Sequence, residues 1–416
     1  MKHMRMTFIL IAALIVSSCA APQGANTPAE QVQPTRTLTT APPRPGASAV
    51  PTEMVPQPST TLPPPKATRT PQFVIHKDYS AAIEGSDLYP LAAAGPFLVG
   101  RRTFPARDSS RPGRQISITV WYPALLVGED TTASVIPDAV PDPSGAPYPL
   151  LLSSTKVARI FAPTLVSHGF TWASIDGIDT YEPMNLELIQ QPLDILFALD
   201  QVVTNPPEGL EGTIDAERSG AIGYSFDGYN ALALSGARVD PQFYLGLCED
   251  PIQTKQNSSF WFEGSYHCMP AVKWDLYIAA AGERAEVDPD ALWQPFTDER
   301  IKAVMPMACE GWWLFGEKGL AAVEVPALFL AATNDFLYPE NALIFEHLGS
   351  QDKTFISILN RDHMIVYDPE MLLRMRHFAT AFFSYYLQGK TEYGQYFSQE
   401  FVDQLEGMQW GVLDDE

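Results

Sequence analysis

The chain has 416 residues and a formal net charge of -22, from 27 Lys and Arg against 49 Asp and Glu; 46% of its residues are hydrophobic. The apolar fraction is that of a globular protein, and the length suits two domains or one large α/β domain with additions. So acidic a chain argues against a nucleic-acid partner, because phosphate binding needs clustered Lys and Arg. Four Cys without a C-x-x-C pair argue against a structural zinc site. We find no cofactor motif and no metal-ligand cluster.

The N-terminus has the features of an export signal. Lys2 and Arg5 precede the apolar run 7–16, which is too short for the roughly 20 helical residues that span a bilayer. Residues 16–19 (VSSC) resemble a bacterial lipobox. The resemblance implies that residues 1–18 are removed and that Cys19 is acylated, which would anchor the chain at the outer face of a bacterial membrane. An ordinary secretory signal with an incidental Cys is the alternative.

Residues 19–71 differ in composition from the rest of the chain. They are rich in Pro, Thr, Ala and Gln and contain no aromatic residue. Such a segment cannot bury enough apolar surface to offset the entropy lost on ordering, and its prolines favour extended conformations. We expect a disordered linker that holds a domain of residues 72–416 away from the membrane surface.

Two kinds of apolar run alternate along this domain. Short runs rich in β-formers predict strands, and apolar residues three or four apart predict helices. The expected strands cover residues 97–104, 115–122, 149–153, 170–175, 219–223, 301–307, 325–332 and 353–359. The expected helices cover residues 187–203, 226–237 and 370–387. This alternation predicts an α/β fold with a mostly parallel, doubly wound sheet.

The stretch from about 240 to 298 does not follow this alternation. It contains several aromatic residues and two cysteines but no clear strand or helix pattern. Long irregular insertions in compact domains are usually functional or mobile. We expect an irregular cap over the active-site end of the sheet.

The sharpest local motif is residues 223–228 (GYSFDG), between an expected strand and an expected helix. In that context G-x-S-x-G marks a tight turn that exposes a nucleophilic serine and requires small neighbours. Gly223 occupies the first glycine position, whereas Asp227 stands at the second and Gly228 follows one residue later. Ser225 is therefore a candidate nucleophile, and a strand–helix turn with an incidental serine is the alternative.

Such a serine requires a carboxylate and a histidine later in the chain, in that order. His363 lies in a loop directly after the last expected strand, and Asp335 lies at the end of the strand before it. Sites in open α/β sheets form at the C-terminal ends of strands, so Ser225, Asp335 and His363 are the expected triad. Two alternatives stay open: Asp335 could cap the following helix, and Asp362 could be the acid.

With these motifs the chain from about 97 to 396 resembles the α/β-hydrolase superfamily, most closely the branch of dienelactone hydrolases and platelet-activating-factor acetylhydrolase-like esterases. The matching segments are residues 121–123 (WYP), 167–170 (SHGF), 193–200 (LDILFALD), 223–229 (GYSFDGY), 298–304 (DERIKAV), 325–335 and 362–363 (DH). The resemblance implies that Ser225 is the nucleophile, Asp335 the orienting acid and His363 the base.

The oxyanion hole departs from this pattern. One donor should be the backbone N–H of Phe226, and the other should come from the loop after strand 149–153. That loop usually carries His-Gly or Pro-Gly in the resembling families, whereas this chain has Thr155, Lys156 and Val157, any of which could supply an N–H. Together with Asp227, this makes two departures at one catalytic feature.

Export permits disulfides. Cys248 and Cys268 both lie in the expected cap, so we predict that they pair, whereas Cys309 follows a core strand and is expected to be a buried thiol. Trp312, Trp313 and Tyr224 are candidates for an apolar substrate pocket. Packing in the core and cap is the alternative for the two tryptophans.

The function expected from these features is that of a membrane-anchored, extracytoplasmic serine esterase acting on a small-molecule or lipid-like ester through an acyl-enzyme, without a cofactor or metal. A peptidase or amidase on the same fold would differ only in its leaving group. The alternative of another class is a catalytically weak or inactive lipoprotein that binds an apolar ligand or a surface partner. No pattern in the sequence indicates an oligomeric state.

Overall fold

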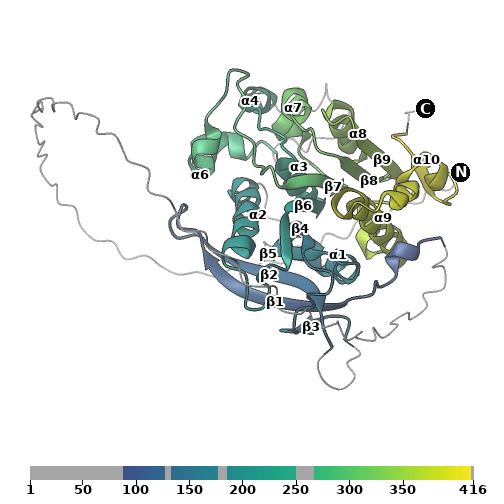
Figure 1. The fold of residues 1–416 in the computed structure, drawn as a ribbon. Helices are drawn as coiled ribbons and strands as arrows, with labels where there is room; N and C mark the ends of the chain where they lie inside the picture. Colours follow the sequence, from purple (N-terminus) through teal and green to yellow (C-terminus); the bar gives the residue numbers. More distant parts are fainter. Residues whose placement is uncertain (1–87, 127–132, 177–184, 250–266, 414–416) are drawn as a thin grey trace, which may run out of the picture. The chain divides into compact units, whose positions relative to one another are not determined.

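The structure, a computed structural model, describes residues 88–126, 133–176, 185–249 and 267–413 (Figure 1). The expected signal, the lipidation site Cys19 and the linker lie outside these residues. Among the helices of the described residues, none is both long enough and apolar enough to cross a membrane.

A ten-stranded sheet forms the centre of the described domain, in the order β10-β9-β8-β7-β6-β4-β5-β2-β1-β3. The strands from β9 to β5 in this order pair in parallel, whereas β2 is antiparallel to both of its neighbours and β10 is antiparallel to β9. The prediction of an α/β fold with a mostly parallel sheet is confirmed. The strands are β1 (Leu98–Arg107), β2 (Gln115–Ala124), β3 (Ile136–Pro137), β4 (Tyr148–Ser154), β5 (Thr171–Ile175), β6 (Ile214–Tyr224), β7 (Ile301–Met307), β8 (Ala327–Ala332), β9 (Lys353–Ile358) and β10 (Met408–Trp410).

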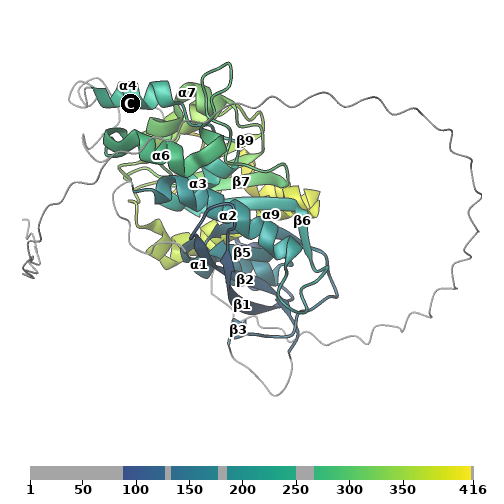
Figure 2. The same cartoon turned by 90° about the vertical axis from the view of Figure 1, so that its left-hand side faces the viewer.

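Helices cover both faces of the sheet (Figures 1 and 2). Helices α1 and α9 pack on one face, while α2, α3, α7 and α8 pack on the other. The α-helices are α1 (Thr155–Ser167), α2 (Glu187–Thr204), α3 (Phe226–Leu234), α4 (Pro241–Glu249), α6 (Trp274–Ala281), α7 (Trp312–Ala321), α8 (Tyr338–His347), α9 (Pro369–Gln388) and α10 (Gln399–Val402). Short 3-10 helices are η1 (Pro90–Ala92), η2 (Pro270–Lys273), η3 (Gly282–Ala285), η4 (Ile365–Tyr367) and η5 (Thr391–Phe397).

The central strands supply side chains to two cores. Leu150 and Leu152 of β4 pack in the core on the α2 side, whereas Leu151 between them packs in the core on the α1 side. Every residue of β4 and β8 is buried. Strands buried on both faces are mostly apolar, which is why the sequences of β4 and β8 show apolar runs without alternation.

Local signals explain where the long helix α9 begins and ends. The Asp368 side chain accepts hydrogen bonds from the backbone N–H groups of Glu370 and Met371, and Pro369 takes the first helical position. Gly389 ends the helix in a left-handed conformation, with φ of 70°. The apolar face between these ends packs on the sheet.

The expected strands and helices are all present at nearly the expected bounds. The largest difference is β6, which begins at Ile214 rather than Ser219 because its first residues, though partly charged, pair with Tyr148 and Pro149 of β4. The helix α1 occupies the stretch in which a loop was expected at Thr155, Lys156 and Val157.

The insertion between α3 and β7 was expected to be irregular; within the described residues it is helical at 241–249 and 270–285, whereas residues 286–300 contain no helix. Its helix α4 packs against α7, and its helix α6 packs against α2. The helical pattern of α6 is obscured because Leu276 and Ile278 are exposed although apolar. The insertion also contacts the end of the sheet, since His267 lies 3.4 Å from Glu310, three residues beyond β7.

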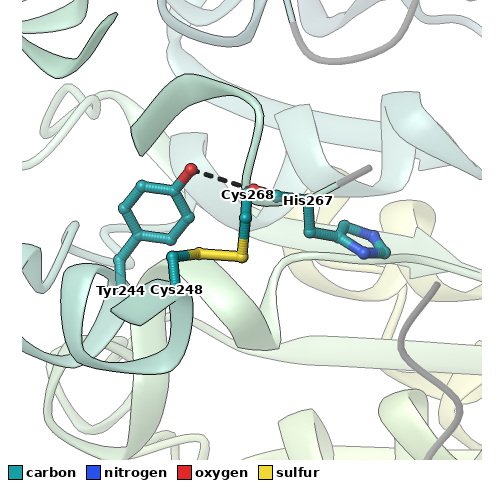
Figure 3. Close-up of a disulfide and its surroundings, with 4 residues drawn as sticks. All are labelled: Tyr244, Cys248, His267 and Cys268. Atoms are coloured by element: carbon teal, nitrogen blue, oxygen red, sulfur yellow. Dashed lines mark hydrogen bonds between the residues drawn. A yellow bond between two sulfur atoms is a disulfide. The ribbon is translucent and has the colours of Figure 1, made fainter. Parts of the chain in front are cut away.

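The predicted disulfide is present. Cys248, in α4, is bonded to Cys268, just before η2 (Figure 3). Beside it, the Tyr244 hydroxyl donates a hydrogen bond to the carbonyl oxygen of His267, at 2.9 Å. Cys309 is a buried free thiol, as expected.

Candidate active site

Three parallel strands bring the three candidate residues to one edge of the sheet. Ser225 directly follows β6, Asp335 follows β8, and His363 follows β9. Because β6, β7, β8 and β9 are successive parallel neighbours, their C-terminal ends lie together. The order of the strands therefore brings His363 within hydrogen-bond distance of Ser225, 138 positions away in the sequence, and of Asp335, 28 positions away.

His363 joins the other two side chains. Its Nε2 lies 2.9 Å from the Ser225 hydroxyl, and its Nδ1 lies 2.7 Å from Oδ2 of Asp335. The Asp335 side chain is fully buried and also accepts a hydrogen bond from the backbone N–H of Leu337. Asp362, the other candidate acid, accepts a hydrogen bond from the backbone N–H of Met364 instead. A hydroxyl, an imidazole and a carboxylate in this order can generate a nucleophile.

The backbone at Ser225 is strained. Its φ of 60° and ψ of -124° lie outside the regions that residues with a side chain favour. A Cβ at Gly223 would stand 1.7 Å from the carbonyl oxygen of Asp227, so no side chain fits there. A Cβ at Gly228 would stand 2.5 Å from that of Cys309. The turn therefore needs its second glycine at 228, which leaves position 227 able to carry a side chain.

The Asp227 side chain extends to the C-terminal end of β4. Its side chain is buried, and Oδ2 accepts a hydrogen bond of 2.7 Å from the Ser154 hydroxyl. Its Oδ1 accepts one of 3.2 Å from the Asn230 amide. Burial raises the pKa of the Asp227 carboxyl, and Ser154, the nearby Lys156 and Asn230 oppose this shift. Ser154 directly precedes Thr155, Lys156 and Val157, so Asp227 is bonded to the residue that adjoins the other departure found in the sequence.

The expected oxyanion loop is corrected by the structure. Thr155, Lys156 and Val157 form the first turn of α1, and no loop separates them from β4. Ser154 is the residue before the helix and has the extended backbone, φ of -73° and ψ of 161°, that suits a cap. The segment has no Gly or Pro to interrupt the helix, so it starts directly at the strand end. Phe226 is likewise the first residue of α3.

Aromatic and apolar side chains surround His363. The rings of Tyr224 and Phe336 each lie 5.4 Å from its ring, measured between centroids. Tyr224 is buried, and burial raises the pKa of its hydroxyl. Phe336, Met364 and Tyr367 are exposed by 59%, 55% and 67%. Sequence reasoning missed these last three, although Phe336 adjoins Asp335 and Met364 adjoins His363.

The two tryptophans proposed for the pocket differ in their surroundings. Trp313 is fully buried, and its ring packs against Tyr244 and His267 of the insertion. Trp312 is partly exposed and packs against Phe243 and His347. Core packing, the alternative considered from the sequence, accounts for the position of Trp313.

The buried side chain of Glu340 lies beside the site but takes no part in the hydrogen bonds of the triad. Oε1 of Glu340 accepts hydrogen bonds from the backbone N–H groups of Gly311 and Trp312, at 2.8 and 3.0 Å, and so holds the start of α7. Burial, together with repulsion from Glu310, raises the pKa of Glu340 to about 8. Within the described part of the chain, no group of three or more His, Cys, Asp or Glu side chains is arranged to hold a metal ion.

Comparison with known proteins adds no assignment: no family model and no curated protein matches this chain.

Proposed function

We propose that the protein is a serine hydrolase of carboxylic esters, built on the α/β-hydrolase fold. The observation that carries the proposal is His363 placed between the Ser225 hydroxyl and the buried Asp335 carboxylate, at 2.9 and 2.7 Å. The strained turn at Ser225, between a strand and a helix, supports it, as does the chain order of serine, acid and histidine.

In the proposed reaction His363 takes the proton of Ser225 as the hydroxyl oxygen attacks the ester carbonyl carbon. Asp335 holds the imidazole in the tautomer that presents a bare Nε2 and stabilises the imidazolium that forms. The tetrahedral intermediate collapses when His363 protonates the leaving alcohol. Water, activated by His363, then cleaves the acyl-enzyme and regenerates Ser225.

Backbone N–H groups would stabilise the negative oxygen of the tetrahedral intermediate. We assign one donor to Phe226, at the start of α3, and the other to the first turn of α1, at Thr155, Lys156 or Val157. Helix N-termini suit this role because their first N–H groups have no partner within the helix and the helix dipole favours negative charge there.

The substrate class follows from the side chains around His363. The exposed apolar side chains Phe336, Met364 and Tyr367 favour an apolar substrate, such as a lipid-like or aromatic ester. Acylation of Cys19 and the linker of residues 19–71 would hold the site outside a bacterial membrane. Tyr224 and Trp312 are the further side chains that we propose to contact the substrate.

Hydrolysis of p-nitrophenyl acetate, butyrate and octanoate by the full-length chain in mild detergent tests the proposal. The wild type should release p-nitrophenol, and Ser225→Ala and His363→Ala should each lower kcat by about 10⁴-fold or more. His168→Ala is a matched control because His168 lies at the C-terminal end of α1, where its Nε2 donates to the carbonyl oxygen of Ala93, away from the triad hydrogen bonds. Release by the wild type no faster than by Ser225→Ala would reject the proposal and favour a binding role.

A further inference from the structure

Two serines precede the two helices that border the proposed oxyanion site, and neither caps its own helix. Ser225 precedes α3 and Ser154 precedes α1, and neither side chain makes a hydrogen bond to its helix. The Ser225 hydroxyl is bonded to His363 instead, as a nucleophile must be. The Ser154 hydroxyl is bonded to Asp227.

Serine before a helix normally accepts a hydrogen bond from the N–H of the second or third helical residue. For α1 these residues are Lys156 and Val157. The backbone of Ser154 already has the extended conformation that capping requires, yet its side-chain oxygen accepts no hydrogen bond from the helix. A capped N–H could not also serve an oxyanion, because the serine oxygen would occupy its only donor direction.

Asp227 fixes that direction. Its carboxylate is an acceptor 2.7 Å from the Ser154 oxygen, and it is held in turn by the amide of Asn230, whose nitrogen also bonds to Gln191. Asp227 and Ser154 are both buried, so water does not compete for the hydroxyl.

Resting on the proposed function, we propose that Asp227 is a positioning residue that keeps the Ser154 hydroxyl from capping α1 and thereby leaves the first-turn N–H groups of α1 for the oxyanion. Asp227 acts through Ser154 and touches neither substrate nor nucleophile. Asp227 and the absence of glycine after β4 are then connected. The hydrogen bond from Ser154 to Asp227 does what a glycine-containing loop would otherwise do, which is to leave a backbone N–H available for the oxyanion.

Substitutions at Asp227 and Ser154 should not have additive effects on kcat. Asp227→Ala removes the acceptor, so Ser154 turns to cap α1 and kcat falls by at least about tenfold, towards the 10²–10³-fold loss of one oxyanion donor. Ser154→Ala removes the competing hydroxyl and leaves kcat close to that of the wild type. The double variant therefore regains the activity that Asp227→Ala lost. KM changes little throughout, because the oxyanion exists only beyond the ground state.

Two further variants separate positioning from simple stabilisation. Asp227→Asn keeps an oxygen that accepts from Ser154 and should retain most of kcat. Ser219→Ala is a matched control, because Ser219 is also buried in the sheet but its hydroxyl donates to the carbonyl oxygen of Ala216, near the start of β6. It should lower the thermal midpoint without lowering kcat per folded molecule.

The experiment measures kcat and KM for p-nitrophenyl butyrate, and the thermal midpoint, for the full-length wild type and these variants, with Ser225→Ala as the background. Loss in Asp227→Ala with recovery in the double variant supports the inference. If the wild type is active but Asp227→Ala retains its kcat, or if the double variant does not recover activity, the inference is overturned and the proposed function stands. A wild type no faster than Ser225→Ala overturns the proposed function and the inference with it.

Discussion

Glu340 shows how a buried carboxyl group can serve structure rather than reaction. It is almost fully buried, its oxygen accepts two backbone N–H groups at the start of α7, and the nearby carboxyl of Glu310 opposes its ionisation. Because the pKa of Glu340 is raised from 4.5 to about 8, the folded state binds a proton that the unfolded state has released between these two pH values.

Stability should therefore fall as the pH rises from about 5 to 8, by up to about 1.4 kcal/mol per pH unit from this group. Glu340→Gln keeps an oxygen for the N–H groups of Gly311 and Trp312 but cannot titrate, so its unfolding free energy should vary less over the same range. Urea unfolding at several pH values measures the difference. Glu346→Gln, on the exposed side of the same helix, is the control. Equal pH dependence in wild type and Glu340→Gln would refute the raised pKa.

At Ser225 the backbone strain, of the order of 1–3 kcal/mol, has to be offset by its surroundings. The N–H of Ser225 donates to the carbonyl oxygen of Met307 in β7, and the N–H of Gly228 donates to the carbonyl oxygen of Ser225. The Gly223 position admits no Cβ. These contacts hold the turn on the strand beside it.

Among the elements, the insertion between α3 and β7 owes part of its order to the disulfide. Cys248 and Cys268 are 20 residues apart, and the bond links α4 to the segment before η2. Next to it, His267 lies against Glu310 and Trp313, so the disulfide also holds the insertion near the end of β7.

Replacing both cysteines by alanine should lower the unfolding free energy by about 3 kcal/mol in the chain-entropy model for a loop of this size. Chemical denaturation of the wild type and the double variant, each with and without reductant, measures the loss. Reductant should destabilise the wild type and leave the variant unchanged. A variant as stable as the oxidised wild type would contradict a stabilising role for the bond.

The sequence predicts elements well where one segment carries the whole signal. Continuous apolar runs revealed β4 and β8, and the order of strands and helices indicated the parallel sheet. The start of α1 at Thr155 is not predicted, because the resembling families have a loop with glycine at this point, although Ser154 is itself a typical residue before a helix. In α6 the exposed apolar residues hid the helical period.

Contacts between distant segments were less predictable. The proximity of Ser225, Asp335 and His363 is predictable, because each follows a strand of a parallel sheet and the order of strands and helices along the chain is visible in the sequence. The hydrogen bond between Ser154 and Asp227 joins residues 73 positions apart, and no local pattern indicates it. Asp227 and the segment after Ser154 are separate departures in the sequence, and the pairing of β4 with β6 brings them together.

At the scale of the whole molecule, the candidate site lies at the C-terminal edge of the sheet, and the proposed lipid anchor is at Cys19. The expected linker of residues 19–71 would separate the two, so the proposed anchor would set where the proposed enzyme meets its substrate and would take no part in the chemistry. The proposed function requires above all that Ser225 is an activated nucleophile.

Labelling of the full-length folded protein with a fluorophosphonate probe tests this claim most directly, with peptide mapping to locate the phosphonylated residue. We expect a single label, on Ser225, that forms rapidly in the folded wild type and slowly in His363→Ala. After heat unfolding, no label should be detected on Ser225. A folded wild type that carries no label on Ser225, or that labels at the same rate without His363, would contradict it.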